Sequence, residues 1–183
     1  MLSREKMKSN SEGCKLLVVG DKKVGKSSFI IRYTDNEFNS VWVPFDFKVK
    51  NINYQNKSIK LQIWEPGKGG EMYKNPVKLM CVSCSGVVIA YDISNRTSFN
   101  SVENWIKDIK EYTQGEAILV WIGTKCDNTN KEVSYEEGEI LAKKYNIGFF
   151  ETSASTNQNV SEVFNYLVEQ IINKNNHTGC CIL

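Results

Sequence analysis

The sequence predicts an α/β fold: a mainly parallel sheet of six strands, with helices on both faces and one antiparallel strand at an edge. Three observations lead to this prediction. Short apolar runs rich in β-branched residues are typical of buried parallel strands. Between them lie stretches whose apolar residues recur at helical spacing, as expected of crossover helices. One pair of runs is separated by a turn so short that it indicates an antiparallel hairpin.

The strands are expected in six segments. Four apolar runs should form the parallel strands: KLLVVG (15–20), SGVVIAYD (85–92), AILVWIG (117–123) and IGFFETS (147–153). The segment FDFKVKNINY (45–54) alternates with period two, and a turn at Gln55–Lys57 leads into SIKLQIW (58–64). Ligands of such sheets bind at the carboxyl ends of the strands, so we expect the functional residues there.

Helices are expected between the strands. One follows KLLVVG after a tight turn and reaches Tyr33. Two more are indicated by apolar stripes at Phe99, Val102, Trp105, Ile106, Ile109 and Tyr112, and at Val160, Val163, Phe164, Leu167, Val168 and Ile171. We interpret both stripes as core-facing surfaces and not as cofactor sites.

Composition excludes several functional classes. The 183 residues fit one domain, and the net charge of +2 argues against a nucleic-acid binder. The start of the chain has no apolar run typical of a signal peptide, and no segment has the length of a membrane span, so we expect a cytosolic protein with reduced thiols. His177 is the one histidine, which rules out a histidine-based triad. Cys81 and Cys84 have CxxC spacing, but no second pair completes a zinc site, so we interpret them as structural thiols.

The first motif is a phosphate-binding loop. The segment GDKKVGKS (20–27) matches GxxxxGK[ST] between a predicted strand and a predicted helix. Glycines let the backbone approach phosphate oxygens, and the loop N–H groups with the helix N-terminus form a positive concave surface. Lys26 should reach the β- and γ-phosphates, and Ser27 should bind Mg²⁺. The expected phosphate-binding residues are Gly20, Asp21, Lys22, Lys23, Val24, Gly25, Lys26, Ser27 and Ser28.

Two further motifs indicate a guanine base. The strand AILVWIG is followed by Thr124, Lys125 and, two residues on, Asp127. A carboxylate at Asp127 accepts two hydrogen bonds from the N1 and N2 edge of guanine, a pair that adenine does not offer. The stem of Lys125 can lie along the base. After the next strand come Ser153, Ala154 and Ser155, where the Ala154 N–H can donate to the guanine carbonyl.

Together these motifs resemble the small GTPases of the Ras superfamily, and the Rab family most. GDxxVGKSS, KLQIW, YDIS followed by SF, TKCD, ETSA and a C-terminal double cysteine carry the resemblance. It implies a P-loop NTPase fold of the small G-domain type over residues 13–172 and a flexible prenylated tail at 173–183, and the polar residues 1–12 are expected to be disordered. It also implies GTP or GDP with Mg²⁺ as ligands. Phe38 matches the aromatic residue that covers the base, although a surface aromatic packed on the core is the alternative.

Some base-binding positions depart from the family pattern without contradicting it. Thr124 replaces the asparagine of NKxD, but TKxD resembles the Rho-family form. Ser155 replaces the usual lysine of SAK, which should weaken packing on the base.

The first switch departs more seriously. The family places a threonine there that binds Mg²⁺ and contacts the γ-phosphate, yet no threonine occurs between Thr34 and Thr97. The segment is also about three residues shorter than the Rab pattern, and Ser40 comes too early to replace the threonine. Trp42, Pro44 and Phe45 make it apolar, and either a partner-binding surface or packing on its own domain explains them.

The second switch lacks the family's glutamine. Instead of DxxGQ, the strand KLQIW is followed by Glu65, Pro66, Gly67, Lys68 and Gly69. Either Lys68 replaces the glycine or, after a one-residue insertion, Gly69 supplies it, and the glutamine position is then Gly69 or Gly70. Since that glutamine orients the attacking water, we expect badly weakened hydrolysis and no intact catalytic residue. Glu65 is a second candidate Mg²⁺ ligand, through a water molecule.

Lys22 and Lys23 are the third departure, beside the γ-phosphate position. Their bulk can hinder the transition state or an arginine finger, their charge can favour a polyphosphate, or both can point to solvent.

The chain ends in Cys180-Cys181-Ile182-Leu183, which fits a geranylgeranylation signal and the CCxx ending of Rab proteins. Two lipids anchor stably where one does not. The alternative is an unmodified polar tail. Even when extended, the spacer 173–179 reaches only about 25 Å, which keeps the domain close to the bilayer.

The sequence therefore predicts a monomeric, prenylated, Rab-like guanine-nucleotide-binding protein. By resemblance it acts in vesicle traffic on the cytosolic face of an endomembrane or the plasma membrane, with a cytosolic pool. Effectors, an exchange factor, a GDP-dissociation inhibitor and the prenylation machinery are the implied partners. The rival hypothesis is a pseudo-GTPase, a membrane-tethered interaction module that no longer cycles. An ATP-dependent kinase or transporter ATPase is disfavoured by Asp127 and by the chain's size.

Overall fold

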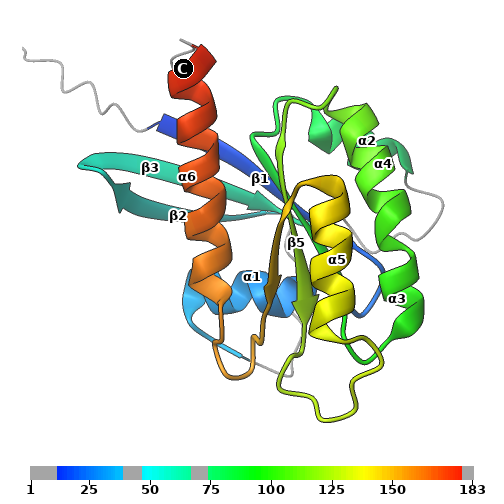
Figure 1. Ribbon diagram of the computed structural model, residues 1–183. Coiled ribbons are helices and arrows are strands. Elements are labelled where there is room, and N and C mark those ends of the chain that lie inside the picture. Colours follow the sequence, from blue (N-terminus) through cyan, green and yellow to red (C-terminus); the bar gives the residue numbers. More distant parts are fainter. Residues whose placement is uncertain (1–11, 39–46, 67–73, 179–183) are drawn as a thin grey trace, which may run out of the picture.

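The computed structural model describes residues 12–38, 47–66 and 74–178 (Figure 1). Its strands form one six-stranded sheet in the order β2-β3-β1-β4-β5-β6. The strands are β1 (Glu12–Gly20), β2 (Phe47–Tyr54), β3 (Lys57–Trp64), β4 (Gly86–Asp92), β5 (Ile118–Thr124) and β6 (Gly148–Glu151). The helices are α1 (Lys26–Asp35), α2 (Lys74–Cys81), α3 (Arg96–Asn100), α4 (Val102–Tyr112), α5 (Tyr135–Tyr145) and α6 (Val160–Thr178).

The pairing of the strands confirms the predicted fold class. β1 pairs in parallel with β3 and β4, and β5 pairs in parallel with β4 and β6. β2 pairs antiparallel with β3 and lies at the sheet edge. The two-residue turn between them is formed by Gln55 and Asn56, with φ angles of 48° and 62°. Both residues have a left-handed backbone conformation, which a two-residue hairpin turn needs in order to match the twist of the strands.

Helices cover both faces of the sheet. In Figure 1, α1 and α6 lie on one side of it, and α4 and α5 lie on the other. Alternate residues of the strands point to opposite faces, so Leu16 and Val18 of β1 pack beneath α1 and α6. Leu17 and Val19 of the same strand pack with residues of α2 and α4. The central strand β4 is buried at every residue, as its continuous apolar run predicts.

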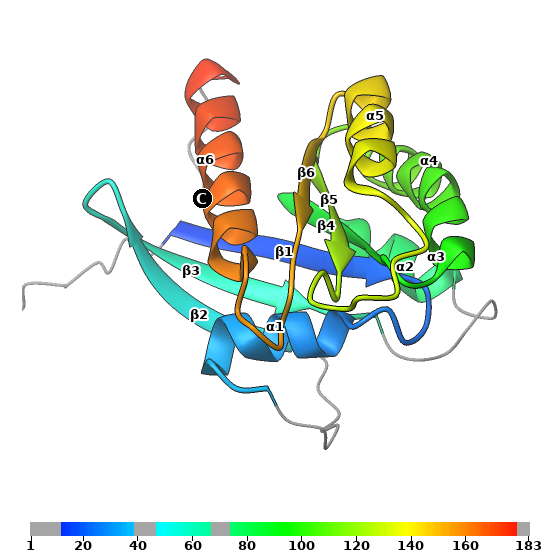
Figure 2. The same ribbon diagram turned by 60° about the horizontal axis from the view of Figure 1, so that its bottom comes forward.

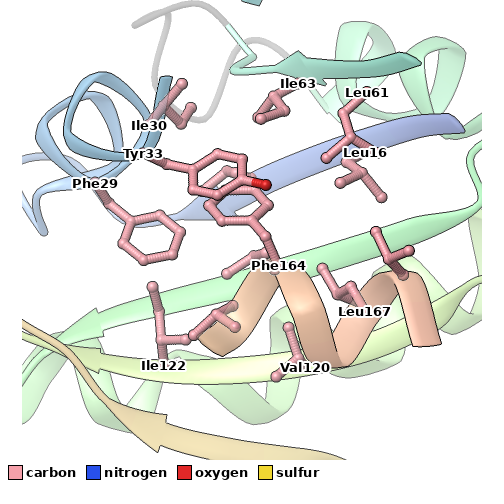
Figure 3. Packing of buried hydrophobic residues seen from close by; sticks show 14 of the residues in the cluster. Leu16, Phe29, Ile30, Tyr33, Leu61, Ile63, Val120, Ile122, Phe164 and Leu167 are labelled. Atoms are coloured by element: carbon pink, nitrogen blue, oxygen red, sulfur yellow. The ribbon is translucent and has the colours of Figure 1, made fainter. Parts of the chain in front are cut away.

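An aromatic stack fixes α1 against α6 (Figure 3). Tyr33 of α1 stacks on Phe164 of α6 with ring centroids 3.8 Å apart, and Phe29 of α1 stacks on the same ring at 5.2 Å. All three side chains are almost fully buried, and each contributes roughly 1.5–3 kcal/mol of hydrophobic stabilisation. Because α1 starts at Lys26, this core contact fixes the beginning of the helix next to the carboxyl ends of the strands.

Four features differ from the sequence prediction. The stretch 99–112 is not one helix, because α3 ends at Asn100 and α4 begins at Val102. The helices α2 and α5 were not predicted. The last helix continues through Thr178, so residues 173–178 are helical and do not form the flexible spacer that was expected from residue 173. Lys174 supports this extension, because its ammonium donates to the backbone carbonyl and the carboxylate of Glu116.

Among the described residues, no helix combines the length and the apolar character that crossing a lipid bilayer requires.

Candidate functional site

The loop between β1 and α1 lies at the carboxyl edge of the sheet, where the strands β5 and β6 also end. Figure 2 brings this edge forward, with the loops after β1, β5 and β6 around α1. Gly20 and Gly25 have φ angles of 139° and 95°, which favour glycine. A Cβ at Gly20 would lie 2.1 Å from the carbonyl oxygen of Ala90, so a side chain there would push the loop off β4. The glycines of the predicted phosphate loop are therefore required by its conformation.

The polar groups of this loop suit an anion. Within the described residues, the backbone N–H groups of Lys23, Gly25 and Ser27 donate no hydrogen bond to a protein acceptor. The Lys26 ammonium lies at the same loop, donating to the carbonyls of Gly20 at 2.9 Å and Asp21 at 2.7 Å. Unpaired N–H groups at a helix N-terminus, next to an ammonium, form a surface that attracts phosphate.

The side chains of Lys22 and Lys23 are exposed. Lys23 adopts a left-handed backbone with φ of 65°. All three interpretations of this pair stay predictions.

The two residues that the sequence predicts as Mg²⁺ ligands, Ser27 and Glu65, are in contact with each other. The Ser27 hydroxyl donates to Glu65 Oε1 at 3.0 Å, and both side chains are half-buried. Ser27 is in the first turn of α1, whereas Glu65 directly follows β3. Hydroxyl and carboxylate oxygens are hard ligands of the kind Mg²⁺ prefers. The longer glutamate side chain thus still reaches the serine.

Thr124 ties the end of β5 to the phosphate loop. Its buried hydroxyl lies 2.5 Å from the Val24 carbonyl and 2.8 Å from the Tyr91 carbonyl. The two carbonyls share the single hydroxyl proton as acceptors. The threonine therefore supports the loop by hydrogen bonding.

Lys125 makes a second bridge to the same loop. Its ammonium donates to the Lys23 carbonyl at 3.1 Å and to the Asp92 carboxylate at 2.5 Å. Asp92 ends β4, and its side chain is only 9% exposed. Burial raises the pKa of Asp92, but hydrogen bonds from Lys125 and Ser94 outweigh it and hold the pKa below its ordinary value. Asp92 thus keeps its charge and fixes the direction of the Lys125 side chain.

The groups expected to contact the base are accessible. The Asp127 carboxylate is exposed, and no ion pair engages it within the described part of the chain. The Ala154 N–H donates no hydrogen bond to a described residue. Their loops are joined, because Cys126 N–H donates to the Thr152 carbonyl at 3.0 Å. Ser153 is fully buried, and its hydroxyl accepts from the Thr156 N–H at 3.0 Å, which shapes the turn that follows.

Two residues that make contacts at this site, Arg32 and Trp105, were missed by the sequence reasoning. Arg32 of α1 donates to the carbonyls of Ala154 at 2.6 Å and Ser155 at 3.2 Å, and its guanidinium lies 5.9 Å from the centre of the Phe38 ring. Trp105 of α4 donates from its indole nitrogen to Asp21 at 2.9 Å. Both are long-range contacts. Trp105 was assigned to a core stripe, and no local pattern marks Arg32.

Several predicted residues lie beyond the described part of the chain. Pro66 is the last described residue before a gap, whereas Gly67, Lys68 and Gly69 lie outside the described residues. The same holds for the lipidation residues Cys180 and Cys181 and for most of the first switch.

The thiols Cys81 and Cys84 are buried, in agreement with their structural interpretation. Burial raises the pKa of Cys81 to about 11 and that of Cys84 to about 12, so both thiols are protonated at neutral pH.

A phosphate loop whose N–H groups are available, a serine–carboxylate pair beside it and an exposed aspartate after β5 fit a small guanine-nucleotide-binding protein. Comparison with known proteins agrees. The model of the Ras family matches residues 15–173, so the chain belongs to the Ras family.

Several Rab proteins are similar to the chain. The Ras-related protein Rab-3 of Caenorhabditis elegans is 43% identical over 164 residues, covering 87% of this chain and 74% of the relative. Human Rab-8B is 38% identical over 166 residues, covering 88% and 80%, and rat Rab-13 is 37% identical over 164 residues, covering 87% and 80%. The chain is thus a Rab-like small GTPase.

Ras-family proteins bind guanine nucleotide with Mg²⁺ and hydrolyse GTP. The described residues fit both ligands. The N–H groups of the loop suit the phosphates, the Ser27–Glu65 pair offers oxygen ligands, and Asp127 offers two acceptors to the base.

Proposed function

We propose that this protein is a Rab-like, prenylated guanine-nucleotide-binding regulator of vesicle traffic that hydrolyses GTP very slowly if at all. One observation carries the nucleotide part of the proposal. Thr124 and Lys125 bind the carbonyls of Val24 and Lys23, so the base-reading segment is held directly against the phosphate loop. Such a connection gives a single site that spans a base and its phosphates.

Each residue of the site has a distinct task in this proposal. Lys26 exchanges its loop carbonyl partners for the β- and γ-phosphates, and the loop N–H groups donate to the same oxygens. Ser27 would bind Mg²⁺ directly and Glu65 would bind it through a water molecule, and the ion would neutralise charge on the phosphates. Asp127 accepts from the N1 and N2 edge of guanine, and Ala154 donates to its carbonyl.

Slow hydrolysis is inferred from the sequence of the second switch. Glycine stands at the position of the water-orienting glutamine under either alignment, at Gly69 or Gly70. Binding uses residues that the chain keeps, so nucleotide retention and nucleotide turnover are expected to separate.

The membrane part of the proposal follows from the last residues. Cys180 and Cys181 fit prenylation, and two lipids would keep the domain on the cytosolic face of a membrane. With α6 helical to Thr178, only Gly179 separates the described helix from Cys180, the first of the two cysteines. The proposed partners are effectors, an exchange factor, a GDP-dissociation inhibitor and the prenylation machinery, as in the Rab family.

The decisive experiment is to release and chromatograph the nucleotide from purified protein and then to follow GTP turnover with Mg²⁺. We expect GDP or GTP in near-stoichiometric amount, and loss of binding in Lys26→Ala. Glu169→Ala, an exposed substitution more than two turns from the start of α6, is the control and should leave binding unchanged. Absence of any guanine nucleotide, bound or added, would overturn the proposal, and rapid intrinsic turnover would overturn its slow-hydrolysis part.

A non-cycling pseudo-GTPase is the second candidate. It is favoured by the absence of any threonine between Thr34 and Thr97 together with the missing glutamine, since both belong to the sensing of the γ-phosphate. Under this alternative, Lys26→Ala changes neither membrane residence nor partner binding.

A further inference from the structure

We propose that Arg32 is a positioning residue for the guanine base, which holds Phe38 and the Ala154–Ser155 backbone in their base-contacting places. This inference rests on the proposed function. Arg32 lies in the last turn of α1, far from the phosphate loop at the start of the helix. Its side chain reaches across to a loop more than 120 residues later in the chain.

The guanidinium uses its donors on different segments. Nε donates to the Ala154 carbonyl at 2.6 Å, Nη2 to the Ser155 carbonyl at 3.2 Å and Nη1 to the Asn36 carbonyl at 3.1 Å. The Asn36 N–H in turn donates to the Arg32 carbonyl at 3.1 Å, which closes the end of α1. A planar fork with fixed donors is suited to bridge two backbone segments in this way.

Phe38 is the third group that Arg32 contacts. The guanidinium carbon is 5.9 Å from the centre of its ring, within the range of cation–π attraction. The ring is 49% exposed, so the protein itself covers only part of it. An aromatic ring held by a cation on one side leaves an apolar surface for a base on the other.

Base binding depends on these groups more than the family pattern would suggest. Ser155 has no stem long enough to cover the base, so cover must come from Phe38 and Lys125. The base loop is held toward β5 by the bond from Cys126 N–H to the Thr152 carbonyl. Arg32 holds the same loop from the other side, at the residue whose N–H must meet the guanine carbonyl. Loss of Arg32 should therefore loosen both base contacts at once.

The test measures how fast a fluorescent methylanthraniloyl-GDP leaves full-length protein after addition of excess GDP with Mg²⁺. We expect Arg32→Gln to speed dissociation about tenfold, since charge-assisted bonds are lost. Arg32→Lys keeps the charge without the fork and should give an intermediate rate. The matched control is Arg96→Gln, because Arg96 also binds another segment, through Glu137, and also lies over an aromatic ring, Phe99. It should change the rate less than about twofold.

A double-mutant cycle with Phe38→Leu separates positioning from general support of the fold. If Arg32 acts through Phe38, Arg32→Gln should speed dissociation less in the Phe38→Leu background than in wild type. Equal factors in both backgrounds would overturn the proposal, as would an unchanged rate in Arg32→Gln or an equal effect of Arg96→Gln. A wild-type protein that binds no GDP would instead overturn the proposed function itself, so the two failures are distinguishable.

Discussion

The base-facing end of the site and its γ-phosphate end differ in how closely their sequences resemble the family pattern. At the base end, Asp127 and Ala154 follow β5 and β6, and the loops that carry them are hydrogen-bonded to each other, to α1 and to the phosphate loop. At the γ-phosphate end, no threonine occurs between Thr34 and Thr97, and we propose that a glycine stands at the glutamine position of the second switch. Under the proposed function, this difference means that binding and turnover depend on separate residues, so that one can be lost without the other.

Replacing the Asp127 carboxylate should have the largest effect, and it tests whether the base end of the site is used for binding. In Asp127→Asn the side chain no longer accepts two charge-assisted hydrogen bonds, each worth about 1.5–3 kcal/mol. Affinity for GDP should fall by roughly 10²–10⁴-fold, since about 1.4 kcal/mol corresponds to a factor of ten. The amide can donate to the oxygen at position 2 of xanthine, so xanthosine diphosphate should bind better to the variant than to wild type. Equilibrium titration with both fluorescent nucleotides measures the two changes.

Asp108→Asn on α4 is the control for a lost aspartate charge away from the site, and it should leave both affinities unchanged. An Asp127→Asn protein that still binds GDP like wild type would mean that the base end is no longer used, and that the two ends do not differ as described.

The conformation of the phosphate loop could be anticipated from the sequence, because its residues are contiguous in one short motif at the end of an apolar strand, whereas the base contacts of Asp127 and Ala154 stay predictions. Glycine at position 20 illustrates this, since its spacing to Lys26 identified the loop and the 2.1 Å approach to Ala90 explains it. The capping box of α5, in which Ser134 and Glu137 bond each other's backbone N–H groups, was a readable helix signal that was overlooked. Arg32 and Trp105 could not be found in this way, because their partners lie 84 to 123 residues away in the chain.

Restoring the missing glutamine tests the γ-phosphate end. If positioning of water is the lost step, Gly69→Gln or Gly70→Gln should raise GTP turnover by up to about 10²-fold, the scale of an orientation effect. Only one of the two variants should do so, and it identifies the correct alignment of the second switch. Single-turnover hydrolysis at saturating Mg²⁺ is the measurement.

Nucleotide affinity is the control in this pair, because neither glycine belongs to the base end. Affinity for GDP should stay within a few-fold of wild type in both variants. If both leave turnover unchanged, the threonine-free first switch, and not the glutamine, limits hydrolysis, and the γ-phosphate end is altered in more than one necessary part.

The smallest expected effect concerns Asp92, which connects the two ends by directing Lys125 toward the phosphate loop. Asp92→Asn weakens an ion pair that is buried on one side only, so we expect about 1–2 kcal/mol of lost stability at pH 7. Because the pKa of Asp92 is held below its ordinary value, its contribution to stability is fully present above the ordinary carboxylate range and is lost as the pH falls through the lowered value.

Thermal unfolding of the GDP-bound protein should therefore separate wild type from Asp92→Asn at pH 7 and pH 5 by the same margin. Below about pH 4 that margin should shrink. Wild type and Asp92→Asn share all other carboxylates and the nucleotide, so the titration of these groups cancels when the two stabilities are subtracted. A margin that stays constant down to pH 3 would mean that the stabilising contact of Asp92 does not depend on its charge, and Lys125 would then be held by the Lys23 carbonyl alone.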